Sequence, residues 1–153
     1  MQPSAPLFGP LDAVMGSTGP GGALVIEYVL LVLVLANFAT RLLAHRRYTS
    51  EYDDEGAEGI DRYPIHEASN VLLVLTSFYY TTISQHGGIV MSMLVLGLVI
   101  TDFFEFESRL VEARRDLRLE RPKGAIVAAL VLFMYAAYQS VFWVIKGPWS
   151  AII

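Results

Sequence analysis

The sequence contains no cysteine and little charge, and each absence excludes a class of site. With no cysteine among its 153 residues, the chain has no disulfide framework, thiolate zinc site, iron–sulfur cluster or thiol nucleophile. Charged residues make up 17% of the chain, whereas an ordinary soluble domain has about 25%. The formal net charge of −4 argues against nucleic acid as a partner.

Most of the charge lies between four long apolar segments, at about 22–44, 66–85, 89–106 and 125–145. A helix crosses the ~30 Å hydrocarbon core of a bilayer with about 20 residues. We therefore predict an all-α integral membrane protein in which four transmembrane helices form a compact bundle over residues 22–146. Residues 1–21 are expected to be a flexible extracellular tail, and residues 147–153 a short extracellular C-terminal tail.

The connections between these segments differ in character. Only His86, Gly87 and Gly88 separate the second segment from the third. One long helix is an alternative there, but adjacent glycines favour a helix stop, so we predict a helical hairpin. The acidic connection 46–65 is expected to be irregular, and the polar residues after 106 to continue the third helix until Pro122 and Gly124 end it.

The basic residues predict the orientation of the chain in the cell membrane. Short loops rich in lysine and arginine stay in the cytoplasm. Ten of the eleven basic residues lie in or beside the two longer connections, and only Lys146 lies elsewhere. We therefore expect both connections to be cytoplasmic and both termini to be extracellular. Arginine exceeds lysine nine to two, which favours a halophilic source, although a GC-rich genome has the same effect.

Polar residues inside the apolar segments are the candidate functional site, because ionisable groups in a membrane are costly. They gather toward the cytoplasmic ends of the first three segments: Asn37, Arg41, His45, His66, Asn70, Asp102, Glu105 and Arg109. One interpretation is a proton relay or a site with histidine and carboxylate ligands for a metal. In the other, which we favour, Arg41 pairs with Asp102 or Glu105 and the charges mark the ends of the spans.

Known ligand spacings do not support a cofactor. The sequence has no H-x-x-x-H, E-x-x-H or H-E-x-x-H motif, and bis-histidine haem ligation by His45 and His66 would require matched depth on two helices. We predict no metal site, cofactor or catalytic residue. A second candidate surface, for docking or lipid contact, follows the third helix and consists of Arg114, Arg115, Arg118 and Arg121.

The apolar segments also resemble a known family. EYVLLVLVLANFATRLLAHR, HEASNVLLVLTSFYYTTISQHGG and VLGLVITDFFEFESRLVEAR are similar to an uncharacterised family of small haloarchaeal multi-pass membrane proteins, from Gly22 onward. The resemblance implies a membrane location and a haloarchaeal source. It implies no activity and no site residue.

Three functions are consistent with these features. The first is a non-enzymatic accessory or assembly subunit that contacts the lipid bilayer and packs against another membrane protein or a second copy of itself. The second is a small oligomeric transporter or channel whose path is lined by Glu27, Asn37, Asp102 and Glu105. The third is a metal- or haem-binding redox subunit that uses His45, His66, Asp102 and Glu105. The spans consist mainly of Leu, Val and Ile, so we expect the first.

Overall fold

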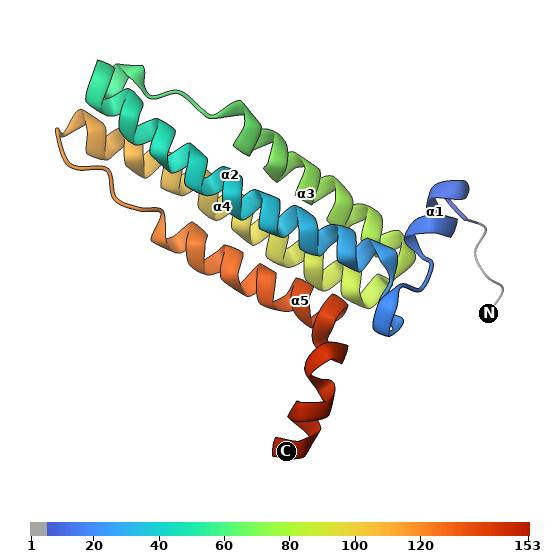
Figure 1. Cartoon of the computed structure of the whole chain (residues 1–153). Helices are drawn as coiled ribbons and strands as arrows, with labels where there is room; N and C mark the ends of the chain where they lie inside the picture. The colour runs from blue at the N-terminus through green and yellow to red at the C-terminus, as the bar shows by residue number, and fades with distance from the viewer. Residues whose placement is uncertain (1–5) are drawn as a thin grey trace.

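A computed structural model describes residues 6–153, which form a bundle of four long helices (Figure 1). The long helices are α2 (Val25–Glu55), α3 (Pro64–Ile83), α4 (Gln85–Arg114) and α5 (Lys123–Ile152). A short helix, α1 (Pro10–Met15), and two 3-10 turns, η1 (Pro20–Gly22) and η2 (Ala57–Gly59), complete the described elements.

The long helices run alternately up and down (Figure 1). α2 packs against α3 and α5, and α4 packs against the same two helices, so the four surround a shared interior. α1, the start of α2, the α3–α4 turn and the last part of α5 lie at one end of the bundle, and we call this the termini end. The opposite end carries η2 and the α4–α5 connection, and we call it the loop end.

The buried residues of each long helix form one stripe. In α2 they are separated by three or four positions, as in a heptad repeat: Ile26, Leu30, Val34, Asn37, Arg41, Ala44 and Tyr48. The buried residues of α3 and α5 follow the same spacing. This periodicity keeps one face of a helix toward its neighbours in bundles whose helices cross at small angles.

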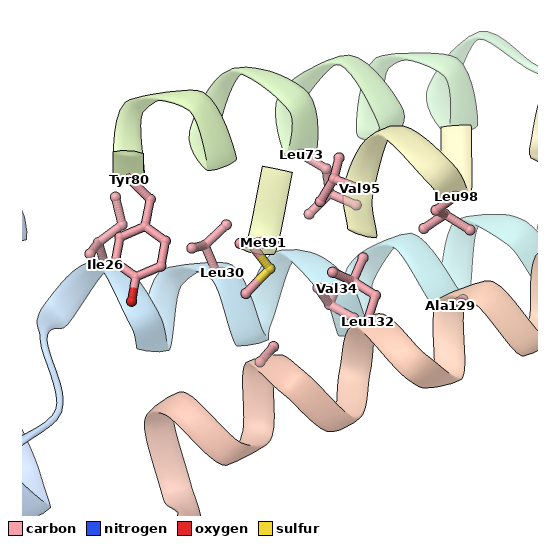
Figure 2. Close-up of a cluster of buried hydrophobic side chains, with 11 residues drawn as sticks. Ile26, Leu30, Val34, Leu73, Tyr80, Met91, Val95, Leu98, Ala129 and Leu132 are labelled. Carbon is pink, nitrogen blue, oxygen red and sulfur yellow. The ribbon is translucent and has the colours of Figure 1, made fainter. Parts of the chain in front are cut away.

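Two apolar clusters occupy the interior. The larger lies within the four-helix part and includes Leu30, Leu73, Val95 and Leu132 among its fully buried members (Figure 2). The smaller lies at the loop end and is formed by Ala44, Tyr48, Ile60, Phe106, Ala113 and Leu119. Burial of apolar side chains stabilises such clusters by about 25 cal/mol per Å² removed from water.

The outward faces of the long helices are also apolar. Large side chains exposed there include Val32, Leu42, Leu75, Met93 and Phe104. Patches of this extent on a soluble monomer are rare. Three helices, α2, α4 and α5, are long and apolar enough to cross a membrane.

The helix break between α3 and α4 lies at Ser84, so the predicted turn at residues 86–88 is corrected by two residues. Gly87 and Gly88 belong to the first turn of α4. A Cβ atom on Gly88 would collide with the backbone of Thr81 in α3. The glycines therefore allow close approach of the two helices and do not end either one.

Helical structure extends into the segments expected to be irregular. α2 continues to Glu55, well into the acidic connection, because its buried stripe continues through Ala44 and Tyr48 into the loop-end cluster. Residues 1–21, for which we expected a flexible tail, include α1 and the beginning of η1. α5 continues to Ile152, and its last turns bend away from the bundle (Figure 1). Pro148 within these turns cannot donate a backbone hydrogen bond, which favours the bend.

α4 continues beyond the third predicted span as expected, but it ends at Arg114, before Pro122. Asp116 follows with a φ of 56°, a left-handed conformation that interrupts a helix. Pro122 instead precedes the first residue of α5, a position at which proline does not disrupt helical hydrogen bonds.

Candidate functional site

Five polar side chains meet inside the bundle, and we call them the polar layer: Asn37, Arg41, His66, Asn70 and Asp102. Asn37 and Arg41 are one turn apart on α2, and His66 and Asn70 are one turn apart on α3. Asp102 comes from α4. Residues four positions apart share one helix face, so the buried stripes of α2 and α3 bring these side chains to Asp102.

Asp102 is the shared acceptor of the layer. Its Oδ2 accepts hydrogen bonds from Arg41 Nη2 at 2.7 Å, His66 Nε2 at 2.8 Å and Asn70 Nδ2 at 3.0 Å. Its Oδ1 accepts a further bond from Arg41 Nε at 3.3 Å. The exposed fraction is 3% for the Arg41 side chain and 13% for that of Asp102. Only an ionised carboxylate accepts all of these bonds, and charge-assisted bonds of this kind are the strong ones.

The amides of the layer close a ring of hydrogen bonds. Arg41 Nη1 donates to Asn37 Oδ1 at 2.7 Å, and Asn37 Nδ2 donates to Asn70 Oδ1 at 2.8 Å and to Ser69 Oγ at 2.9 Å. Asn70 Nδ2 in turn donates to Asp102 Oδ2, which closes the ring. Buried polar groups satisfied in this way fix the relative register of the helices that carry them.

Thr40 contacts the remaining ring nitrogen of His66. Its Oγ1 lies 2.9 Å from His66 Nδ1 and donates to the Asn37 carbonyl at 2.9 Å. Both nitrogens of His66 therefore have a partner inside the bundle. Within residues 6–153, no group of three His, Cys, Asp or Glu side chains is placed to hold a metal ion. The arrangement is that of an internally paired ion cluster, because its acceptors are occupied by protein donors.

The other members of the predicted cluster lie apart from the layer. Glu105 Oε1 accepts a hydrogen bond from the Gly124 backbone N–H at 2.9 Å, at the start of α5. The Arg109 guanidinium lies 5.0 Å from the centre of the Tyr48 ring. His45 Nδ1 is buried and has no hydrogen-bond partner among the described residues. The structure thus pairs Arg41 with Asp102 and leaves Glu105 to the α4–α5 connection.

Glu27 lies toward the opposite end of the bundle. It is ten residues before Asn37 on α2, which is about 15 Å along a helix. Its Oε1 accepts a hydrogen bond from Tyr80 at 2.5 Å, and its Oε2 accepts one from the Leu24 backbone N–H at 2.8 Å. Glu27 therefore provides an acceptor for a backbone N–H at the start of α2 and links this helix to α3 through Tyr80.

Several residues of these networks were missed from the sequence. Thr40 and Ser69 bond to the polar layer, and Gln139 donates to the Tyr80 hydroxyl at 3.3 Å. Hydroxyl and amide side chains are common in apolar spans, so composition does not distinguish them. The heptad spacing of α2 and α3 was the available signal, because it places Thr40 and Ser69 beside buried positions.

The predicted docking surface lies at the loop end and is exposed. Arg114 is the last residue of α4, and Arg115, Arg118 and Arg121 lie in the connection that follows. Among residues 6–153 none of these four arginines forms an ion pair, whereas Arg47 and Arg62 at the same end do.

A family model described as a domain of unknown function, DUF7313, matches residues 2–153. The chain belongs to the DUF7313 family. Comparison with curated proteins and with solved structures gave no match. The family covers the whole bundle described above, which agrees with the expected membership of an uncharacterised family. Within this DUF7313 chain, the polar layer is the most highly connected group of ionisable side chains in the described bundle. The haloarchaeal source stays a prediction.

Proposed function

We propose that the protein is a non-enzymatic subunit with four membrane spans, which assembles with another membrane protein through the arginine surface at its loop end. The observation that carries this proposal is the internal pairing of the polar layer. Arg41, His66 and Asp102 hydrogen-bond to one another and to neighbouring amides. Outside the layer the bundle exposes an apolar flank, and its loop end exposes Arg114, Arg115, Arg118 and Arg121 together with the acidic residues of the two connections.

The proposal counts α3 as the fourth span, although its composition is more polar than that of the other three. Its polar residues His66, Asn70, Ser77 and Tyr80 are buried against neighbouring helices. Apart from Glu67, whose side chain is 41% exposed in the first turn of the helix, the large side chains that α3 exposes are apolar: Ile65, Val71, Leu72, Leu75 and Phe78. A helix whose polar residues are satisfied inside a bundle and whose outer face is apolar is compatible with lipid. Its 20 residues also match the thickness of one hydrocarbon core, about 30 Å.

The orientation follows from charge and topology together. An even number of spans brings both termini to one side, and the loop end carries nearly all the basic residues. The positive-inside rule then places the loop end in the cytoplasm and both termini outside. The arginine surface is available to a cytoplasmic or inner-leaflet partner in this orientation.

The assembly proposal is tested by site-specific photocrosslinking in the native host. A photoreactive residue at Arg118, on the arginine surface, is expected to give an adduct of defined mass with one second protein, and the two should co-migrate in mild detergent. The matched control is Ser17, which is equally exposed but lies at the termini end. Substitution of Arg114 and Arg115 by glutamate should abolish both the adduct and the co-migration, because it reverses the charge of the surface. A stable monomer without adducts from Arg118 would overturn the proposal.

A further inference from the structure

Arg109 on α4 is a buried cation that forms no ion pair with the described residues. Only 7% of its surface is exposed, and its Nε has no hydrogen-bond partner. Among residues 6–153 it forms no ion pair, although Arg41 in the same bundle is paired with Asp102. Isolated buried charges are strongly unfavourable, and each unsatisfied buried donor in a folded protein requires an explanation.

The carboxylates near Arg109 are engaged elsewhere. The charges of Asp102, Glu105 and Glu112 all act on it. Asp102 accepts from Arg41, Glu105 accepts from the Gly124 N–H, and Glu112 accepts from the Glu120 N–H at 3.1 Å. These three carboxylates lower the positive potential around Arg109, but none of them forms a hydrogen bond or an ion pair with its guanidinium.

The Tyr48 ring does not replace the missing partner. The carbon at the centre of the Arg109 guanidinium lies 5.0 Å from the centre of this ring, and such a cation–π contact uses none of the N–H donors as a conventional hydrogen bond. The N–H donors of arginine point outward in the guanidinium plane. They therefore remain available to an acceptor at the rim.

A second unpaired nitrogen atom and a second arginine lie in the same region as Arg109. His45 Nδ1, on α2, is buried and also has no partner. Both Arg109 and Arg121 lie close enough to His45 for their charges to act on its ring. His45, Arg109 and Arg121 thus lie in the same region of the loop end, and His45 Nδ1 and Arg109 Nε are both buried there without a hydrogen-bond partner.

The depth of this group along the bundle indicates its ligand. Arg109 is seven residues beyond Asp102 on α4, about 10 Å along the helix axis. α3 begins at Pro64, only two residues before His66 of the polar layer. Arg109 therefore lies several ångströms beyond the end of the hydrocarbon-spanning part of α3, at the level of the lipid headgroups. Lipid phosphates lie at that level, and basic pockets at the cytoplasmic side bind acidic headgroups.

We propose that Arg109, with His45 and Arg121, forms a binding site for a single phosphate oxyanion at the loop end of the bundle. Guanidinium presents paired donors that match the oxygens of phosphate. Because Glu105 and Glu112 are close, the site favours a singly charged phosphodiester, as in a lipid headgroup, over a doubly charged phosphate. Apart from Arg121, which also belongs to the arginine surface, the site lies on α2 and α4, and it concerns a phosphate ligand and not a protein partner.

The test measures thermal unfolding of the full-length protein after delipidation in detergent. Three additions are compared: mixed micelles containing phosphatidylglycerol, mixed micelles containing diacylglycerol with the same acyl chains, and inorganic phosphate against chloride at equal ionic strength. Phosphatidylglycerol is expected to raise the Tm of the parent, since a ligand that binds the folded state stabilises it. Diacylglycerol, which lacks the phosphate, is expected not to do so.

The variant Arg109→Met removes the donors and keeps the length of the side chain. It should lose the phosphatidylglycerol-dependent rise and bind the lipid at least ten-fold more weakly. Without lipid its Tm should equal or exceed that of the parent, because an unpaired buried charge has been removed. The control Arg46→Met removes an exposed arginine of α2 at the same level and should retain the full rise. Arg109→Lys, which keeps the charge but loses the planar donors, should show a reduced rise.

The arms of the experiment also separate the two sources of phosphate. A rise with phosphatidylglycerol alone assigns the site to a lipid headgroup, and a rise with inorganic phosphate as well assigns it to free oxyanions too. Both results support an oxyanion site if Arg109→Met abolishes them. The proposal is overturned if neither addition raises the Tm of the parent, or if Arg109→Met responds as the parent does. Photocrosslinking at Arg118 is unaffected by either result, so failure of one proposal does not imply failure of the other.

Discussion

Asp102 is the residue on which the polar layer depends, because it accepts hydrogen bonds from Arg41 on α2 and from His66 and Asn70 on α3. A buried ion pair contributes little net stability compared with apolar side chains of the same size, because both charges lose their hydration. Removing one partner is different, since the other is left as an uncompensated buried charge. The layer therefore acts mainly on specificity: it requires α2, α3 and α4 to meet in a single register.

Substitution of Asp102 by asparagine is the corresponding prediction at this scale. The variant leaves the Arg41 guanidinium without a counter-charge and places an amide donor among donors. We expect a loss of about 3–5 kcal/mol in the free energy of unfolding in detergent micelles, the range measured for broken buried pairs. Glu120→Gln is the control, because Glu120 and Lys123 form an exposed pair at 4.0 Å, and such pairs contribute below about 1 kcal/mol. An equally small loss for Asp102→Asn would show that the layer does not hold the bundle together.

At the scale of the element, α1 shows how a segment without a long apolar run acquires a fixed place. Asp12 Oδ2 accepts a hydrogen bond from the Phe8 N–H at 2.9 Å, and its Oδ1 accepts one from the Tyr79 hydroxyl of α3 at 2.7 Å. The Phe8 and Tyr79 rings also pack edge to face, with centroids 5.3 Å apart. α1 is thus held at the termini end by one carboxylate and one aromatic pair.

The docking of α1 is expected to depend on pH through Asp12. The Phe8 N–H first, and then the Tyr79 hydroxyl, hold the pKa of Asp12 below its ordinary value of 3.8. The contribution of this carboxylate is therefore present above the ordinary pKa and is lost as the pH falls through the lowered value. NMR contacts between the Phe8 and Tyr79 rings should weaken in acid. They should already be weak at neutral pH in Asp12→Asn.

Asp116→Asn serves as the control for this measurement, because Asp116 is exposed at the loop end, far from α1. It should leave both the contacts and their acid dependence unchanged. Contacts that persist in acid in the parent, or that survive in Asp12→Asn, would mean that the aromatic pair alone holds α1.

For the whole molecule, the main feature is that three helices are longer than one hydrocarbon core. α2 has 31 residues, and α4 and α5 have 30 each, about 45 Å, against a hydrocarbon core of about 30 Å. The additional turns of α2 and α4 are at the loop end, where they carry the smaller apolar cluster with Tyr48 and Phe106. The loop end is therefore a small folded structure with its own apolar cluster, and not a pair of irregular connections.

Cysteine accessibility tests the topology of the whole chain directly, because the parent has no cysteine and gives no background labelling. Single cysteines at Ser17 and Ile153 are expected to react with an impermeant maleimide in intact cells. Cysteines at Glu58 and Arg118 should react only after permeabilisation. All four positions are exposed, so differences report the side of the membrane. Labelling of Ser17 and Ile153 from opposite sides would exclude an even number of spans.

Much of the fold was predictable from local features of the sequence. Long runs of Leu, Val and Ile predicted the helices. The distribution of arginine predicted which end of the bundle carries the basic residues. The termination of helices was less predictable. Adjacent glycines are typical of a turn, yet Gly87 lies against Tyr80 and Gly88 against the backbone of Thr81, because a missing Cβ permits a close approach as readily as a bend.

The sequence predicted which residues form the candidate site better than it predicted which of them hydrogen-bond to one another. Spacing on single helices identified Asn37, Arg41, His66, Asn70 and Asp102, since residues one turn apart share a face. It also included His45, Glu105 and Arg109, which lie outside the layer. Depth along a helix follows from the sequence, but the rotation of each helix about its axis is decided by packing against its neighbours.

The sequence by itself therefore determined the membrane class, the helical content and the concentration of basic residues at one end, because these depend on composition and period alone. Only the tertiary structure decided that Asp102 is paired while Arg109 is not. The physical reason is that hydrogen bonds between helices depend on distances of a few tenths of an ångström, which the packing of the apolar stripes sets. The same packing leaves Arg109 buried against Tyr48 with its Nε unpaired.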